Sequence, residues 1–203
     1  MHYTFGDAAG QKETTALIDQ NNRHLSYADL EKQVHCLKLR FRELGIGATD
    51  SVALIAGRNP VVALLSISLL ETATLVPINP DSTLQELHQT LKRLPIQAVV
   101  FEKGSPHSRF DLWKTLGFHV IEYECNGWDV TLSSNGQKSE ALIDDLPQNT
   151  ALVLQTSGTT GQPNFVPLTH ANISASIQNL TRSLKLSNHD LCLNMLPMFH
   201  VGG

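Results

Sequence analysis

The chain has 203 residues, of which 41% are hydrophobic and 17% are charged. This composition predicts a soluble globular protein with a sizeable core and excludes wholesale disorder. The 15 lysines and arginines and the 19 acidic residues give a net charge of -4 at pH 7. Proteins that bind nucleic acid, or that dock electrostatically on an acidic membrane, need clustered basic charge, so the mild acid excess argues against both classes.

The cysteines and the N-terminal residues bear on the cellular compartment. Cys36, Cys125 and Cys192 are odd in number and widely spaced, with no CxxC pair, so the sequence indicates neither a disulfide framework nor a zinc site. The first seven residues have no basic start and no apolar stretch, so we expect no signal peptide. The longest apolar run, at 61–70, is too short to span a bilayer. We therefore expect a cytoplasmic protein without a transmembrane segment.

A hairpin and an amphipathic helix are expected first along the chain. Residues 15–27 predict a hairpin around the turn pair Asn21-Asn22. Ser26, with Asp29 at the third helical position, predicts the start of a helix. Its apolar stripe follows a 3.6-residue period, and Gly45 stands where a helix end favours a residue that tolerates positive φ. The stripe consists of Leu30, Val34, Leu37, Phe41 and Leu44.

Strands and helices are then expected to alternate. The apolar run 51–56 predicts a strand buried on both faces, and Asn59-Pro60 opens a helix with Asn59 as its cap. Pro77 lies in the next expected strand, 75–78, and suits an end or an edge of a sheet better than an interior position. The pattern continues with helices at 83–94 and around 110–116, and with strands at 98–101 and 119–121.

This alternation predicts the fold class. Strand and helix repeated at this spacing favour an α/β domain with a mainly parallel sheet flanked by helices. Residues 1–125 supply the first α/β units, and the polar stretch 126–150 is expected to be a loop or a small hairpin. Residues 151–203 form a further unit, with a strand at 151–155, a Gly/Ser/Thr loop, a helix at 169–184 and an apolar run at 191–196.

The Gly/Ser/Thr loop is the segment that indicates chemistry. Glycine lets backbone N–H groups approach an anion closely, and successive N–H groups form a concave anion site. Phosphate oxygens are acceptors, so hydroxyl and amide donors together predict a phosphate-binding loop. The alternative is a polar loop without a ligand, since turn residues gather in loops in any case. The loop has neither the lysine of a Walker A element nor a GxGxxG pattern. Its residues are Thr156, Ser157, Gly158, Thr159, Thr160 and Gly161.

These residues also carry a resemblance to a known family. Residues 156–163 (TSGTTGQP), followed by 166–172 (VPLTHAN), closely resemble the signature loop of adenylate-forming enzymes. That family includes acyl-CoA synthetases, peptide-synthetase adenylation domains and beetle luciferases. The resemblance covers most of the chain, and an eight-residue match between two strands is specific. Further stretches that resemble family motifs are 25–30 (LSYADL), 44–45 (LG), 50–54 (DSVAL), 75–80 (LVPINP) and 196–203 (LPMFHVGG).

The resemblance implies a fold and a reaction. The fold is the incomplete N-terminal part of the adenylate-forming large domain. In the reaction, a carboxylate attacks the α-phosphate of ATP and releases pyrophosphate, and a thiol, usually coenzyme A, then takes the acyl group. The resemblance thus implies ATP, Mg²⁺ and coenzyme A as cofactors and a carboxylic acid as substrate. The residues that would hold the β- and γ-phosphates are Thr156, Ser157, Gly158, Thr159, Thr160 and Gly161.

One departure from the family follows the loop directly. The family usually has Pro-Lys-Gly where this chain has Pro163-Asn164-Phe165. Asn164 stands at a phosphate-facing position but cannot supply positive charge to the leaving pyrophosphate. A charge-assisted hydrogen bond is worth roughly 1.5–3 kcal/mol, against about 1 kcal/mol for a neutral one. We therefore expect weaker ATP binding or a slower first step.

His200 is the candidate catalytic residue. It matches the position that, in acyl-CoA synthetases, lies beside the acyl carboxylate and the pyrophosphate exit, where an imidazole can donate to the carboxylate. Without that motif, one histidine among nine is more often an ordinary surface or core residue. Amino-acid-activating relatives typically carry an aspartate in this stretch, and its absence here favours a plain carboxylic acid. His170 also matches the family and is expected at a helix entry.

The last recognisable motif is also the end of the chain, at Gly203. The family's adenine pocket, magnesium-binding glutamate segment, ribose-binding aspartate and mobile C-terminal domain have no counterpart in these residues. We therefore expect a fragment that does not complete catalysis alone, with the missing C-terminal half as a separate chain for a partner. Two alternatives stay open: a non-enzymatic nucleotide- or phosphate-binding module or degenerate remnant, and a pure interaction domain.

Overall fold

The computed structural model describes residues 13–106, 113, 115, 117–134, 146–156 and 164–200. Its helices are α1 (Tyr27–Glu43), α2 (Val62–Leu70), α3 (Leu84–Leu91) and α5 (His170–Leu184). Its strands are β1 (Thr15–Ile18), β2 (His24–Ser26), β3 (Ser51–Ile55), β4 (Thr74–Ile78), β5 (Ile96–Glu102), β6 (His119–Asn126), β7 (Asp129–Ser134), β8 (Thr150–Thr156) and β9 (Asn164–Thr169).

The N-terminal hairpin and first helix form where the sequence predicts them. β1 and β2 pair antiparallel, and Asn22 takes a positive φ of 59° in the turn between them. The hydroxyl oxygen of Ser26 accepts the N–H of Asp29 at 3.1 Å and so caps α1. Gly45, just after this helix, has a φ of +82°, the left-handed conformation that glycine adopts without steric cost.

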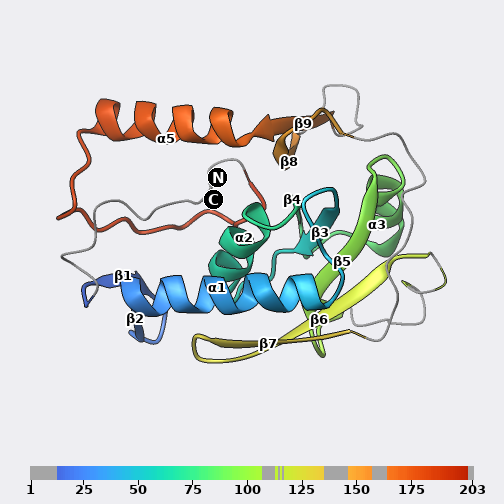
Figure 1. Cartoon of the computed structure of the whole chain (residues 1–203), viewed down its shortest axis with the longest axis horizontal. Coiled ribbons are helices and arrows are strands. Elements are labelled where there is room, and N and C mark those ends of the chain that lie inside the picture. The colour runs from blue at the N-terminus through green and yellow to red at the C-terminus, as the bar shows by residue number, and fades with distance from the viewer. Residues whose placement is uncertain are drawn as a thin grey trace.

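A seven-stranded sheet forms the centre of the molecule, in the order β7-β6-β5-β3-β4-β8-β9 (Figure 1). All pairings from β6 through to β8 are parallel, while the outer strands β7 and β9 pair antiparallel with β6 and β8. The predicted α/β class with a mainly parallel sheet is confirmed. Within the polar stretch 126–150, β7 folds back on β6 as a hairpin.

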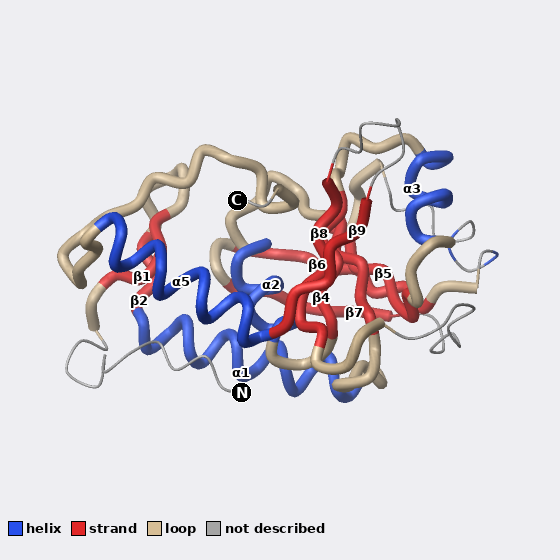
Figure 2. The backbone as a smooth tube through the Cα atoms, turned by 90° about the horizontal axis from the view of Figure 1, so that it is seen from above, coloured by secondary structure: helices blue, strands red, loops and turns tan. Residues whose placement is uncertain are grey.

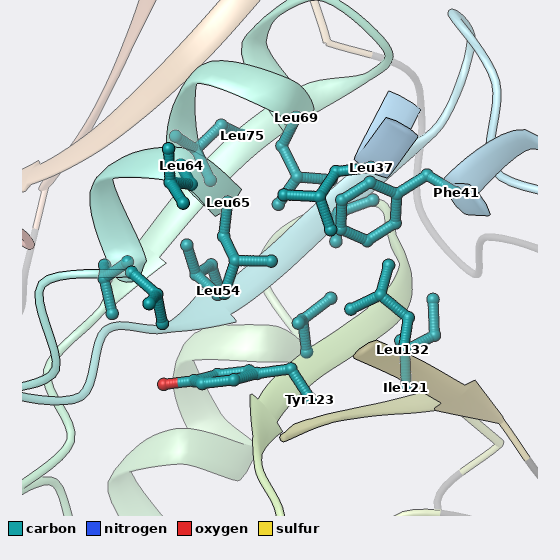
Figure 3. Packing of buried hydrophobic residues seen from close by; sticks show 14 of the residues in the cluster. Leu37, Phe41, Leu54, Leu64, Leu65, Leu69, Leu75, Ile121, Tyr123 and Leu132 are labelled. Atoms are coloured by element: carbon teal, nitrogen blue, oxygen red, sulfur yellow. The ribbon is translucent and has the colours of Figure 1, made fainter. Parts of the chain in front are cut away.

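Helices cover both faces of the sheet, and β3 contributes side chains to each layer. All five residues of β3 are buried. Val52 and Leu54 pack with α1 and α2 in one hydrophobic cluster (Figure 3). Ala53 and Ile55 pack with α3 and Trp113 in a second cluster on the opposite face. A strand buried on both faces has no polar alternation, which is why its sequence is a continuous apolar run.

One expected position is met in part and one is wrong. Pro77 lies near the end of β4, one of the two places expected for it, although β4 itself lies inside the sheet between β3 and β8 and is not an edge strand. The proline is accommodated because Pro77 aligns with Leu54 of β3, whereas the pairing with β8 is limited to Leu75. The helix expected at Asn59 begins later, as α2 at Val62, although the side-chain oxygen of Asn59 accepts the N–H of Val61 at 3.2 Å.

α5 and the segment directly after it contribute no residue to the two cores. α5 runs along one side of the molecule while α1 runs along another (Figure 1), and Figure 2 gives the view at right angles. No residue of α5 is buried. The apolar run after it is also exposed, with Leu191, Leu193 and Met195 each at 80% or more of full exposure. This region therefore presents apolar side chains that the described residues do not cover.

The described residues also bear on membrane spans and on the state of the cysteines. None of the described helices combines the length and the apolar character needed to cross a membrane. Cys36, Cys125 and Cys192 are all free thiols, in agreement with the absence of a predicted disulfide framework.

Candidate functional site

The β8–β9 hairpin carries the predicted phosphate loop between its two strands. Thr156, the last residue of β8, aligns with Asn164, the first residue of β9. The hydroxyl of Thr156 donates to the carbonyl oxygen of Asn164 at 3.4 Å. The structure thus brings these two predicted site residues together at the base of the loop. The remaining predicted residues lie outside the described part of the chain: Ser157, Gly158, Thr159, Thr160 and Gly161.

The base of the loop lies at the surface. Ala151, Val153 and Leu154 of β8 are buried, whereas Gln155 and Thr156 are exposed. Asn164 is exposed as well. β8 is parallel to β4, so the loop leaves from the carboxyl edge of the parallel strands. Ligands of open α/β sheets bind at that edge, which makes the position suitable for a binding loop.

A cavity of about 200 Å³ lies at the same edge, and sequence reasoning missed it. Its lining comes from the residues that follow β3 and β4 and from the end of β5, among them Gly57, Arg58, Asp81, Glu102 and Ser105. β3 and β5 are neighbours whose connections run to opposite faces, through α2 and toward Trp113. A crevice opens where connections diverge in this way. The sequence feature that could have indicated this cavity is Gly57, which directly follows the apolar run 51–56.

The buried hydroxyl of Tyr123 lies next to Gly57, one of the residues that line this cavity. A Cβ placed on Gly57 would lie 3.2 Å from the Tyr123 hydroxyl and 3.5 Å from a carboxylate oxygen of Glu102, so the glycine keeps this space open. The Tyr123 hydroxyl is buried and has no hydrogen-bond partner among the described residues. Burial, together with Glu102, raises the pKa of Tyr123 well above its usual range, so the group remains a neutral donor. Figure 3 shows this hydroxyl at the margin of the first cluster.

The Cys125 side chain is a neighbour of Asn59 and Glu102. Burial raises the pKa of the Cys125 thiol, and the neighbouring Glu102 carboxylate adds to the shift. The side-chain amide of Asn59 donates to the Cys125 sulfur at 2.9 Å. Because the thiolate is the nucleophilic form, a raised pKa makes Cys125 a poor nucleophile. We therefore assign it to packing rather than to chemistry.

His200 lies in the segment after α5. Its side chain is exposed, and its ring centroid is 4.4 Å from that of Phe199. Its backbone N–H donates to the carbonyl of Pro197 at 3.0 Å, which closes a tight turn. Phe199 and Met198 pack against the first hydrophobic cluster and hold this turn on the body of the protein. None of the contacts recorded for His200 reaches Thr156 or Asn164, so no contact in the described residues joins the two predicted sites.

The residues present do not fit a magnesium site of the protein's own. In the described part of the chain, no group of three or more His, Cys, Asp or Glu side chains could hold a metal ion. Residues 146–169 contain no acidic side chain at all. Protein-bound Mg²⁺ usually takes one or two carboxylates in addition to substrate phosphates and water.

Comparison with known proteins identifies the family. The model of the AMP-binding enzyme family matches residues 5–203, nearly the whole chain. The chain belongs to this family. Among its relatives, a probable CoA ligase, CCL9 of Humulus lupulus, is 28% identical over 97% of the chain. 4-Coumarate–CoA ligase 4 of Arabidopsis thaliana is 27% identical over the same share. The chain spans 39% of the first of these proteins and 38% of the second.

Solved structures show the same fold. Apo MatB from Rhodopseudomonas palustris superposes with a TM-score of 0.75 at 19% identity, over 93% of this chain and 38% of that protein. ATP-bound MatB from the same organism gives a TM-score of 0.72 at 20% identity, over 89% and 37% of the two chains. The observed fold of this member of the AMP-binding enzyme family is therefore a known architecture.

Proposed function

We propose that the chain forms the phosphate-binding part of an ATP-dependent acid–thiol ligase. The observation that carries this proposal is the TSGTTG sequence, residues 156–161, leaving an exposed strand end at the carboxyl edge of a parallel sheet. Membership of the AMP-binding family and similarity to CoA ligases support it. Because the chain spans less than two fifths of those relatives, the whole activity is assigned to a larger assembly of which this chain is a part.

The proposed reaction has two steps. First, a carboxylate oxygen of the substrate attacks the α-phosphorus of ATP, the bond to the β-phosphate oxygen breaks, and pyrophosphate leaves. The thiol of coenzyme A then attacks the acyl carbon, and AMP leaves. Catalysis of the first step depends on positioning the phosphates and stabilising the charge that develops on pyrophosphate.

The chain's own residues supply donors for the phosphates. The hydroxyls and backbone N–H groups of the loop bind the β- and γ-phosphate oxygens, with Asn164 as a neutral donor at the loop's return. His200 donates to the substrate carboxylate and orients it. The absence of an aspartate from residues 196–203 favours a carboxylic acid without an amino group to pair. The loop residues in this role are Thr156, Ser157, Gly158, Thr159, Thr160 and Gly161.

A second polypeptide segment completes the enzyme in this proposal. Ile177, Leu180 and Leu184 lie three and four residues apart on α5 and are at least half exposed. Monomeric proteins rarely leave contiguous apolar patches of this kind uncovered. The relatives continue beyond the part that this chain spans. A chain that corresponds to their C-terminal part would therefore cover the exposed apolar face of α5. Exchange of label between pyrophosphate and ATP should then require that chain and should be absent with the 203 residues alone.

ATP titration of the purified chain, followed by backbone NMR shifts, tests the phosphate-binding role. We expect saturable binding that Thr160→Ala weakens several-fold, because one hydroxyl donor to a phosphate is lost. Thr181→Ala on the exposed face of α5 is the matched control and should leave the affinity unchanged. Equal affinities of wild type and Thr160→Ala would remove the loop from the site.

The second candidate is a nucleotide-binding module without catalysis. Asn164 and Phe165 favour it, because they replace the lysine and glycine of the family motif. Both candidates predict ATP binding, so the discriminating result is pyrophosphate exchange after the C-terminal part is supplied. Exchange supports the ligase, whereas ATP binding without exchange supports the module.

A further inference from the structure

The cavity at the carboxyl ends of β3 and β5 is separate from the predicted phosphate loop. None of its lining residues belongs to β8 or β9, and β4 lies between β3 and β8 in the sheet. The cavity measures about 200 Å³. Since a water molecule in the liquid takes about 30 Å³, the cavity has room for a molecule of roughly six non-hydrogen atoms.

Two buried hydroxyl groups at this cavity have no hydrogen-bond partner among the described residues. Tyr123 is fully buried, and its hydroxyl lies next to Gly57, which lines the cavity. Ser105 also lines the cavity, and its hydroxyl oxygen is buried. Buried polar groups are nearly always hydrogen-bonded, because leaving one unsatisfied costs its desolvation free energy. The two hydroxyls therefore indicate an occupant of the cavity that bonds to them.

Gly57 keeps open the space in which such an occupant would meet the Tyr123 hydroxyl. A Cβ at position 57 would lie 3.2 Å from the hydroxyl oxygen of Tyr123 and 3.5 Å from Oε2 of Glu102. A ligand atom near that point is therefore close to hydrogen-bond distance from both oxygens.

The chemistry of the two oxygens specifies the ligand atom. The Glu102 carboxylate only accepts, and it accepts several bonds at once, so a ligand donor adds to the contacts that it already makes. The Tyr123 hydroxyl keeps its proton and needs an acceptor. A ligand hydroxyl meets both requirements, since it donates to the carboxylate and accepts from the phenol. An ammonium group donates only and would leave the Tyr123 proton without an acceptor.

The charges around the cavity favour an uncharged ligand. Arg58 and Asp81 are exposed lining residues whose side chains pair at 3.4 Å, so their charges offset each other. Glu102 is half-buried, and its negative charge opposes anions such as phosphate or carboxylate. The remaining lining is apolar and suits a carbon skeleton: Ile55, Pro80 and Pro106.

We propose that this cavity binds a small uncharged polyol of about three or four carbons. One hydroxyl of the ligand lies between Tyr123 and Glu102, and a second hydroxyl bonds to Ser105. The inference goes beyond the proposed function, because none of these residues is assigned to phosphate binding. Either conclusion stands or fails without the other.

Titration of the full chain with glycerol, followed by backbone amide NMR shifts, tests the proposal. Gly57→Ala fills the space between the two oxygens and keeps every hydroxyl and charge, and the φ of Gly57 lies outside the left-handed region. Gly47→Ala is the matched control, because its nearest neighbour would be 3.9 Å from the added Cβ. We expect saturable shifts at Gly57 and Ser105 in the wild type and the control, and about tenfold weaker binding or more in Gly57→Ala. Equal affinities of Gly57→Ala and Gly47→Ala would overturn the proposal.

A second pair of variants tests the hydroxyl itself. Tyr123→Phe removes one hydrogen bond and should weaken glycerol binding about tenfold, whereas Tyr27→Phe on α1 should change it less than twofold. If Gly57→Ala does not fold, as judged by circular dichroism, Tyr123→Phe decides alone, and an unchanged glycerol affinity overturns the proposal.

The choice of ligand class has its own test. Glycerate has the same three-carbon skeleton with a carboxylate, and we expect no saturable shifts with it because of the Glu102 charge. Glycerate that binds as tightly as glycerol would overturn the assignment of an uncharged ligand. A wild-type chain that shows no saturable shifts with glycerol or with erythritol would overturn the site as a whole. Because ATP is absent from these titrations, none of the outcomes bears on the proposed phosphate-binding role.

Discussion

The helices α1 and α5 have similar lengths but opposite environments. α1 has 17 residues and buries Leu30, Val34, Leu37, Lys38 and Phe41. α5 has 15 residues and buries none. Both carry apolar residues at helical spacing, so the difference lies in what faces them. α1 packs on α2 and the sheet, whereas Ile177, Leu180 and Leu184 of α5 face no core among the described residues.

This contrast separates a region that buries its own apolar side chains from one that leaves them exposed. The strands β3 to β6 and their helices form two cores whose side chains are almost fully buried. β8 belongs to that sheet and buries Ala151, Val153 and Leu154, whereas α5 and the segment after it expose their apolar residues. Thr156 and Asn164, at the base of the predicted phosphate loop, are exposed, although residues earlier in β8 reach the core.

The largest effect is expected from truncating a core leucine. Leu65 of α2 is fully buried, so Leu65→Ala removes packing and leaves a cavity, at a cost of about 3 kcal/mol in the free energy of unfolding. Leu184→Ala on α5 should change it by less than about 0.5 kcal/mol, because that side chain is already exposed. Urea unfolding of both variants measures the difference. Similar losses in the two variants would show that α5 is packed as tightly as α2.

Self-association tests the exposed segment after α5. Apolar side chains on a surface favour contacts between copies, so the wild-type chain should associate with rising concentration. The triple variant Leu191→Lys, Leu193→Lys and Met195→Lys should remain monomeric in sedimentation velocity. A control with the same added charge replaces Gln178, Thr181 and Asn188 by lysine and should associate more than the first variant does. Equal behaviour of the two would assign the effect to net charge rather than to the apolar run.

The next prediction concerns Asn164, the position at which the family motif has a lysine. Asn164→Lys provides a charge-assisted hydrogen bond in place of a neutral one, so ATP affinity should rise, by about tenfold if the gain is about 1.4 kcal/mol. Asn179→Lys, on α5, adds the same charge to a different exposed asparagine and serves as the control. An unchanged ATP affinity for Asn164→Lys would mean that the lysine of the family motif has no counterpart role here.

The smallest effect is expected at the N-terminal cap of α3, which packs in the second buried cluster. The Thr83 hydroxyl accepts the N–H of Glu86, and the Glu86 carboxylate accepts from Thr83 in return. Thr83→Ala should lower the free energy of unfolding by about 1 kcal/mol.

The same cap has a predictable pH dependence. Hydrogen bonds from the Thr83 backbone and hydroxyl lower the pKa of Glu86 below its ordinary value. A lowered folded-state pKa stabilises the protein above the unfolded-state pKa, and the contribution disappears as pH falls through the folded-state value. The destabilisation caused by Thr83→Ala should therefore shrink under acidic conditions in thermal melts. A difference that stays constant down to acidic pH would contradict the reciprocal cap.

Local pattern was sufficient for the secondary structure and for the family. Ser26 and Gly45 mark the two ends of α1 through hydrogen bonding and φ, which depend on neighbours in the chain. The apolar run at 51–56 gives a buried strand because alternation disappears when both faces are covered. The TSGTTG sequence resembles the signature loop of the family, and the match of the family model to residues 5–203 confirms that resemblance from sequence alone.

Contacts between distant segments were decided by the tertiary structure alone. Pro77 lies on an interior strand because β8, more than 70 residues later, pairs with β4 only before the proline. Gly57 and Glu102 meet at a cavity because β3 and β5 are neighbours while their connections leave on opposite faces. Arg93 reaches Phe165 because α3 packs on the face toward which β9 turns that ring. Sequence periodicity specifies which side of an element is apolar, but chain topology specifies what that side meets.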